Sequence, residues 1–328
     1  MRISVYITSY NQKKYLIEAI ESVLNQTLAP SQIIIVDDCS TDGSQEVIAD
    51  YASRYPDLIK PIYHIQNQGV AQTRIDALQA VTGDYVTYVD GDDRFLPSKL
   101  EKEARLLQEN PDAQIAFSNY YYMTEDGIRT GVWAEGEAPH QGNIFLQTFA
   151  RDFPRRVLFR MELVHYSVWK RVGFHDSKLQ FYEDFDMRIR LTKHCRAIYY
   201  NEPLSEIRMH KTGLSNAKAA HHLAALQYIY QKNKPLLDDL SVAERKDVQR
   251  KLGGWMARVA RQAAEQALRE GQHQRGNRVQ TFKYYLQCLK YQPGFFDYKL
   301  TLRILFPHSV YEWLKALFNK VKETKVHF

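Results

Sequence analysis

Three aspartates lie around one glycine in the segment Asp90-Gly91-Asp92-Asp93, directly after the run Tyr85-Val86-Thr87-Tyr88-Val89. Valine, threonine and tyrosine favour a pleated surface, so the run predicts a buried strand. Three carboxylates at the end of that strand would repel one another unless a cation lies among them. In an open α/β sheet, ligands bind at this end of the strands. The segment therefore predicts a divalent metal held by one or two carboxylates and by phosphate oxygens. The alternative is a solvated acidic turn that caps the next helix.

Strands and helices alternate through the first 125 residues, which predicts a parallel sheet with right-handed crossovers. Apolar residues at helical spacing support the first helix, and β-branched runs support the strands. The second helix is expected to take Ser40 or Thr41 as its N-cap. The expected strands are 3–7, 32–36, 59–65 and 85–89, and the expected helices are 14–26, from about 41 to 55, and 70–81.

The remainder of the chain is less regular. Glycines and prolines punctuate residues 126–160, which are expected to be rich in loops, and residues 161–215 are mixed, with one helix over 184–193. Helix is expected from about residue 214 to about 290, followed by a break at Pro293-Gly294 and a last amphipathic helix near 310–322. This pattern predicts a domain over residues 1–215 and a helical C-terminal region over residues 216–328.

Composition narrows the class of protein. No apolar run among the 328 residues approaches the roughly 20 needed to span a bilayer. Cys39, Cys195 and Cys288 have no zinc or redox spacing, and the N-terminus lacks a signal-peptide layout, so we expect a cytoplasmic protein. Residues 1–130 carry 11 Lys and Arg against 19 Asp and Glu, while the remainder carries 33 against 19. An acidic first part argues against nucleic acid as a partner.

Two familiar phosphate-binding loops are missing from the sequence. No Gly-x-Gly-x-x-Gly follows the first strand, and no Gly-x-x-x-x-Gly-Lys-Ser/Thr is present. A nucleotide pocket in this chain must therefore be built in another way.

Six motifs in order resemble the family-2 inverting glycosyltransferases with the GT-A fold. Together they cover about residues 1–215. The resemblance implies a mostly parallel α/β sheet flanked by helices, with a C-terminal helical appendage. It also implies transfer of a sugar from a nucleoside diphosphate to an acceptor hydroxyl. A UDP- or dTDP-sugar is the expected donor. The motifs are Thr8-Ser9-Tyr10-Asn11, Val36-Asp37-Asp38 with the following Cys39 to Ser44, Asn67 to Arg74, Val89 to Asp93, Val172 to Asp176 with Tyr182 to Asp186, and Arg208-Met209-His210.

The resemblance assigns the nucleoside to the first two loops. Thr8, Tyr10 and Asn11 would line the base, with the Tyr10 ring as a stacking face. Asp38 would accept a hydrogen bond from a uracil or thymine N–H. Arg74 would contact phosphate or an acidic neighbour. The alternatives are a packed turn for Tyr10 and helix capping for Asp38.

The resemblance also gives the metal site its residues. Asp92 would bind Mn²⁺ or Mg²⁺ together with the diphosphate, and Asp90 would contact ribose or metal-bound water. His210 would complete the metal shell, where imidazole favours Mn²⁺. Asp93 would bind the donor sugar or cap the next helix. The alternative for His210 is an ordinary loop histidine.

Asp184 is the expected catalytic base. An inverting transfer needs a carboxylate to take the proton of the attacking hydroxyl. Glu183-Asp184 opens a helix, and the negative neighbours Glu183 and Asp186 are expected to raise the pKa of Asp184. Plain N-terminal capping is the alternative.

The other expected partners are a glycan or lipid-linked acceptor and, through the last helix, an anionic membrane surface. That helix has Trp313, Leu314 and Phe318 on one face and lysines around it, and packing on the protein is its alternative role. Two other functions are kept open: a nucleotidyltransferase, and a non-catalytic sugar-nucleotide binder that acts in an assembly. As a glycosyltransferase, the protein is expected to be cytoplasmic or peripheral at the inner face of the membrane.

Overall fold

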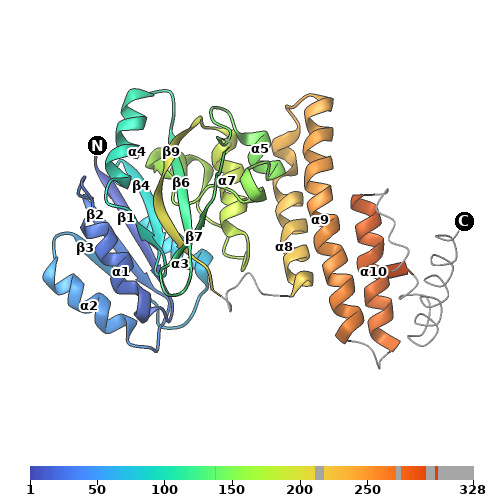
Figure 1. The fold of residues 1–328 in the computed structure, drawn as a ribbon, viewed down its shortest axis with the longest axis horizontal. Helices are drawn as coiled ribbons and strands as arrows, with labels where there is room; N and C mark the ends of the chain where they lie inside the picture. The colour runs from blue at the N-terminus through green and yellow to red at the C-terminus, as the bar shows by residue number, and fades with distance from the viewer. Residues whose placement is uncertain (137, 211–217, 271–274, 293–299, 302–328) are drawn as a thin grey trace, which may run out of the picture. The chain divides into compact units, whose positions relative to one another are not determined.

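The computed structural model describes residues 1–136, 138–210, 218–270, 275–292 and 300–301 (Figure 1). The chain divides into two compact units. The first comprises Met1–Leu214 and Ile229–Glu244, and the second comprises Ser215–Tyr228 and Arg245–Phe328. The expected division at residue 215 stays a prediction. The expected last helix and the Pro293-Gly294 break lie outside the described residues.

Nine strands of the described residues form one sheet in the first unit. They are β1 (Ile3–Ser9), β2 (Gln32–Asp37), β3 (Ile59–Tyr63), β4 (Tyr85–Asp90), β5 (Arg94–Phe95), β6 (Ile115–Met123), β7 (Arg129–Val132), β8 (Leu163–His165) and β9 (Ala197–Arg208).

The helices follow the expected alternation and then dominate the C-terminal part. They are α1 (Lys13–Leu24), α2 (Ser44–Arg54), α3 (Val70–Gln79), α4 (Lys99–Glu109), α5 (Phe145–Ala150), α6 (Tyr166–Val172), α7 (Glu183–Lys193), α8 (Ala219–Asn233), α9 (Val242–Glu270) and α10 (Arg275–Tyr291), with short 3-10 turns at Pro154–Arg156 and Lys234–Leu237.

The strand order is β3-β2-β1-β4-β8-β6-β9-β5, with β7 on β6. Strands β3, β2, β1 and β4 are parallel, as are β6 and β9, whereas β8 runs antiparallel to β4 and β6. The expected mostly parallel α/β sheet with a helical C-terminal region is confirmed. The antiparallel pairings of the second half were not foreseen, because residues 126–215 carry no clear strand periodicity.

The order of the strands explains where a ligand can bind. From β1 to β3 the chain moves one way across the sheet, and it then returns to place β4 on the other side of β1. Right-handed crossovers therefore put α1 and α2 on one face and α3 on the opposite face (Figure 1). The direction reverses between β1 and β4, and the crevice at such a point is where open α/β sheets bind ligands.

The core explains why the central strands form. Ile33, Ile34, Ile35 and Val36 have no exposed surface, so both faces of β2 are covered by helices. This is the pattern expected of a parallel strand from a continuous β-branched run.

Two local expectations were wrong. Helix α2 begins at Ser44 after Gly43, whose φ of 89° suits glycine, and not after Ser40 or Thr41. The Ser40 hydroxyl instead donates to Asp37 (2.6 Å) and accepts from the Asn11 amide (2.8 Å). The third strand ends at Tyr63, because His64 turns inward to the Asp38 carboxylate.

The second unit is helical in its described part. Helices α9 and α10 approach closely at Gly253, where a Cβ would lie 2.8 Å from the Tyr291 carbonyl oxygen. Ala264, Tyr285 and Leu300 form a buried apolar cluster. Within the described ranges, no helix combines the length and apolar character that a membrane span requires.

Candidate active site

The carboxyl ends of β1 and β4 are joined at Asp90. Thr8 lies opposite Asp90 in the strand register, and its hydroxyl donates to Asp90 Oδ1 (2.9 Å). The following Gly91 donates its amide to the Thr8 carbonyl (2.9 Å). A Cβ at Gly91 would lie 2.8 Å from the Thr8 carbonyl oxygen, so glycine lets the loop Asp90–Asp93, the aspartate loop, lie against the backbone at the start of the first loop.

The first loop is held by hydrogen bonds to the loop after β2. Asn11 accepts from the Thr41 amide through its side-chain oxygen (2.8 Å), and its backbone is left-handed with φ of 52°. The Tyr10 side chain is about half exposed, at 48%. An exposed ring beside a fixed polar loop can stack on a base, and this role of Thr8, Tyr10 and Asn11 stays a prediction.

Asp38 is buried and fully engaged by the protein. It accepts from the backbone amides of Gln68 (2.7 Å) and Gly69 (2.8 Å), and His64 Nδ1 lies 2.7 Å from it. His64 Nε2 in turn lies 3.0 Å from Asp76. This Asp38–His64–Asp76 chain ties the second loop to α3. The sequence offered no signal for it, because neither His64 nor Asp76 lies in one of the six motifs.

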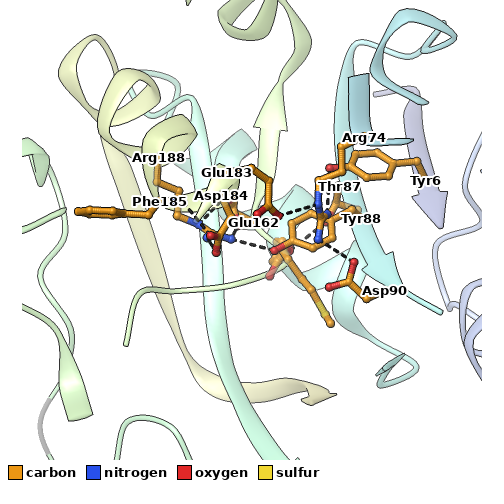
Figure 2. Close-up of polar contacts among 12 residues, drawn as sticks. Tyr6, Arg74, Thr87, Tyr88, Asp90, Glu162, Glu183, Asp184, Phe185 and Arg188 are labelled. Carbon is orange, nitrogen blue, oxygen red and sulfur yellow. Dashed lines mark hydrogen bonds and ion pairs between the residues drawn. The ribbon is translucent and has the colours of Figure 1, made fainter. Parts of the chain in front are cut away.

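Arg74 links the aspartate loop to the start of α7. Its guanidinium donates to Asp90 Oδ1 (2.7 Å) and lies 3.4 Å from Glu183 Oε1, as Figure 2 shows. The side chain is buried and lies over the Tyr88 ring, 4.4 Å from its centroid. Burial opposes the charge, but the surrounding Asp90, Tyr6, Tyr88 and Glu183 raise the pKa of Arg74. The acidic neighbour expected for Arg74 is therefore Asp90, with Glu183 beyond it.

His210 and Asp92 meet at the other side of the aspartate loop. His210 Nε2 lies 2.7 Å from Asp92 Oδ2, and Glu125 lies 3.7 Å from His210 Nδ1. Burial and the nearby Asp90 raise the pKa of Asp92. Asp93 is buried and accepts the Arg208 amide (2.7 Å); burial and its two aspartate neighbours raise its pKa.

The expected three-residue metal set is not assembled in this arrangement. The Asp90 carboxylate faces Thr8 and Arg74. In the part of the chain that the structure describes, no three His, Cys, Asp or Glu side chains are grouped to hold a metal. Asp92 and His210 nevertheless converge and offer one oxygen and one nitrogen. A divalent ion that takes its other ligands from phosphate and water would suit this pair.

Asp184 lies at the start of α7, after Tyr182 in a left-handed conformation with φ of 60°. Its Oδ2 accepts from Arg188 Nη1 (2.5 Å), and Arg188 is held on its other side by Glu162 (3.0 Å) and the Tyr88 hydroxyl (2.8 Å), as drawn in Figure 2. The spacing of Asp184 and Arg188, four residues apart on one helix, could have predicted this pair. Glu162 could not have been found from the sequence.

The expected rise in the pKa of Asp184 is wrong. Burial would raise it, but the positive charges of Arg188, Arg160 and Arg74 outweigh burial and lower the pKa. The raised value belongs to Glu183 instead, where burial and the charge of Asp184 bring the pKa to about 7. The two adjacent carboxyl groups are therefore driven apart in acidity by their surroundings.

A small cavity lies beside Asp184. Its lining includes Arg74, Tyr88, Arg188 and Trp169. His175 also lines it, with a ring nitrogen, Nδ1, that has no hydrogen-bond partner among the described residues. Arg74 thus joins Asp90 of the aspartate loop to the cavity beside the expected base.

A family model described as Glycosyl transferase family 2 matches residues 4–172, which is about half of the chain. Among curated proteins, TuaG of Bacillus subtilis, provisionally named a teichuronic acid biosynthesis glycosyltransferase, is 37% identical over 125 residues. This segment covers 38% of the present chain and 49% of TuaG. EpsE of the same organism, provisionally named a glycosyltransferase, is 32% identical over 159 residues, covering 45% of the present chain and 57% of EpsE. The chain thus spans only about half the length of these relatives.

Solved structures with a similar fold cover about nine tenths of the chain. The crystal structure of TarS from S. aureus has a TM-score of 0.65 at 17% sequence identity, over 90% of this chain and 50% of TarS. A shorter TarS crystal structure, of residues 1–349 in complex with UDP-GlcNAc, has a TM-score of 0.62 at 18% identity, over 89% of this chain and 80% of that one. At such identities the likeness concerns the fold, and it agrees with the expected GT-A architecture.

Proposed function

This chain belongs to glycosyl transferase family 2, and on that basis we propose that it transfers a sugar from a nucleoside diphosphate to an acceptor hydroxyl with inversion at the anomeric carbon. One observation carries the proposal. A continuous series of contacts runs from Asp90 through its ion pair with Arg74 to the Glu183 carboxyl group, next to Asp184. It holds the aspartate loop, where the donor would bind, in a fixed position relative to Asp184, the proposed base. A displacement reaction requires such fixed positions.

The donor is proposed to be a UDP-sugar, with a dTDP-sugar as the alternative. The exposed Tyr10 ring would stack on the base, while Thr8 and Asn11 would contribute polar contacts beside it. Asp38 would reach the base only through an oxygen that already accepts protein N–H groups, so its role would include shaping the loop. The complex of TarS with UDP-GlcNAc, a protein of the same fold, supports the choice of uridine.

Asp92 and His210 are proposed to hold Mn²⁺ or Mg²⁺ against the diphosphate. A bound cation would supply positive charge to the departing nucleoside diphosphate. Asp90, oriented by Thr8 and Arg74, would face the ribose, and Asp93 would face the donor sugar.

Asp184 is proposed to take the proton from the acceptor hydroxyl. Because arginines lower its pKa, the carboxylate is ionised in the neutral range and can accept a proton, but the same arginines make it a weaker base than an ordinary aspartate. Arg188 fixes Oδ2, and the Phe185 amide donates to Oδ1 (2.8 Å), whose second lone pair would take the hydroxyl proton. The alternatives to this assignment are helix capping by Asp184 and a chain that binds a sugar nucleotide without catalysis.

The wider role is proposed from the names of the relatives. TuaG is named for teichuronic acid biosynthesis, so a surface polysaccharide or glycolipid is the proposed product, made on a glycan or lipid-linked acceptor. Residues 1–215 would form the catalytic domain and residues 216–328 a helical region. The enzyme would work in the cytoplasm or at the inner face of the membrane.

Donor hydrolysis tests the proposal. UDP-, dTDP- and GDP-sugars are incubated with Mn²⁺ and the wild-type chain, and nucleoside diphosphate release is measured. Asp184→Asn is expected to lower release by at least about 100-fold, the lower range of a general base, while binding of UDP persists. Asp57→Asn, at an exposed position, serves as the matched control. Activity of Asp184→Asn near that of the control would exclude Asp184 as the base.

A further inference from the structure

Arg160 stands out among the arginines of the site, because no described residue forms a hydrogen bond or ion pair with it. Its neighbours Arg74 and Arg188 are each held by two carboxylates. A guanidinium carries five N–H donors in a planar fork, so an unpaired one in a partly buried position is costly unless a ligand uses it. Arg160 therefore has a binding capacity that the described residues leave unused.

The backbone around Arg160 is fixed. Phe159, Met161 and Glu162 are all nearly fully buried, whereas Arg160 between them is only partly buried. The Met161 carbonyl accepts from Thr87 (2.9 Å) and from Lys99 Nζ (2.7 Å). The side chain is thus presented from an anchored segment rather than from a free loop.

This segment also stores backbone strain. Met161 has φ of 54°, and Arg155 and Arg156 have φ of 54° and 57°, all in the left-handed region that residues with a Cβ rarely adopt. Such conformations persist where surrounding structure imposes them, and they cluster at functional sites. The strain is consistent with a segment shaped to aim Arg160.

Arg160 lies two residues before Glu162, which holds the same Arg188 guanidinium that donates to Asp184. The charge of Arg160 also lowers the pKa of Asp184. According to the proposed function, the transferred sugar and its acceptor must meet beside Asp184.

We propose that Arg160 binds an oxyanion, a carboxylate or a phosphate, on the substrate beside Asp184. This inference rests on the proposed function and adds to it the charge of the substrate. A guanidinium fork matches both anions in a bidentate geometry. The anion could come from two sources: a carboxylate on the donor sugar, or a phosphate on the acceptor.

Calorimetric binding in the presence of Mn²⁺ separates the sources. UDP, UDP-glucose and UDP-glucuronate are titrated into the wild type, Arg160→Gln and Arg160→Lys. The UDP-saturated proteins are then titrated with glycerol 3-phosphate and with glycerol. Arg196→Gln is the matched control, since Arg196 is an exposed arginine that forms an ion pair with Asp112 at the surface.

If the anion is on the donor, Arg160→Gln should weaken the binding of UDP-glucuronate by about tenfold or more. The affinities for UDP and UDP-glucose should be unchanged. If it is on the acceptor, Arg160→Gln should remove glycerol 3-phosphate binding by a similar factor. Arg160→Lys should retain part of either effect, because it keeps the charge but loses the fork. It replaces the glutamine variant in the comparison if that variant fails to fold.

Three outcomes would count against these ideas in distinguishable ways. Equal affinities of wild type and Arg160 variants for both anions would overturn the inference. A loss of affinity for UDP as large as the loss for UDP-glucuronate would also overturn it, because Arg160 would then bind the diphosphate. Failure of wild type and Arg196→Gln to bind UDP would instead overturn the proposed uridine donor.

Discussion

His210 Nε2 lies 2.7 Å from Asp92 Oδ2, although 118 residues separate them in the chain. The strand β9 carries the histidine side of this pair back to the aspartate loop, since Arg208 at its end donates its amide to Asp93. The pair is the only part of the expected metal set that the described residues bring into contact.

His210→Ala should weaken the apparent affinity for Mn²⁺ by at least about tenfold, a loss that even residues which merely support a ligand can cause. Asp92→Asn should weaken it further, because it removes the charged ligand. Mn²⁺ binding is measured by electron paramagnetic resonance in the presence of UDP, and again through the Mn²⁺ dependence of donor hydrolysis. His194→Ala, an exposed histidine, is the control. An unchanged Mn²⁺ affinity in His210→Ala would leave that residue an ordinary loop histidine.

Removal of the Arg188–Glu162 pair should raise the pKa of Asp184, the proposed base. Arg188 is the largest of the positive influences that lower the pKa of Asp184 against its burial. In the double variant Glu162→Gln/Arg188→Gln, the acidic limb of kcat/KM should therefore move to higher pH by about one unit or more. The exposed pair Lys102–Glu202 offers a matched control, Lys102→Gln/Glu202→Gln. A limb that stays in place would show that the limb does not report Asp184.

Glu183 should make stability depend on pH between its ordinary pKa of 4.5 and its raised pKa of about 7. In that window the folded chain holds a proton that the unfolded chain has lost, so the contribution of Glu183 to stability falls as the pH rises. Glu183→Gln cannot ionise, so its Tm relative to wild type should rise between pH 5 and pH 8. Thermal unfolding of both proteins across this range measures the effect. A constant difference in Tm would mean that the pKa of Glu183 is not raised.

Lys99 and Glu103 form a fully buried ion pair beneath the site, with Nζ 2.6 Å from both carboxylate oxygens. Lys99→Met would leave the carboxylate without its partner and should lower the free energy of unfolding by about 3–5 kcal/mol. Lys99→Met/Glu103→Leu removes both charges and should recover much of that loss. Urea unfolding of the three proteins gives the values. A double variant no more stable than the single one would show that the buried charge is not the cause.

The sequence alone was sufficient for the elements that carry the motifs. The runs before Asp37 and Asp90 are continuous and β-branched, so β2 and β4 could be predicted, and the sheet order of an alternating chain then brings their carboxyl ends together. The helix that begins at Glu183 and the helical C-terminal region were found in the same way. These are local properties of the chain, set by backbone propensity and by the spacing of apolar residues.

Only the tertiary structure decided the charges around those motifs. The pKa of Asp184 depends on Arg74 and Arg160 as well as on Arg188 in its own helix, and local spacing says nothing about the first two. The partners of Asp38 come likewise from His64 and the start of α3. Electrostatic interactions act through space between residues far apart in the chain. Their sign at any one carboxylate therefore follows from the fold as a whole rather than from its sequence neighbours.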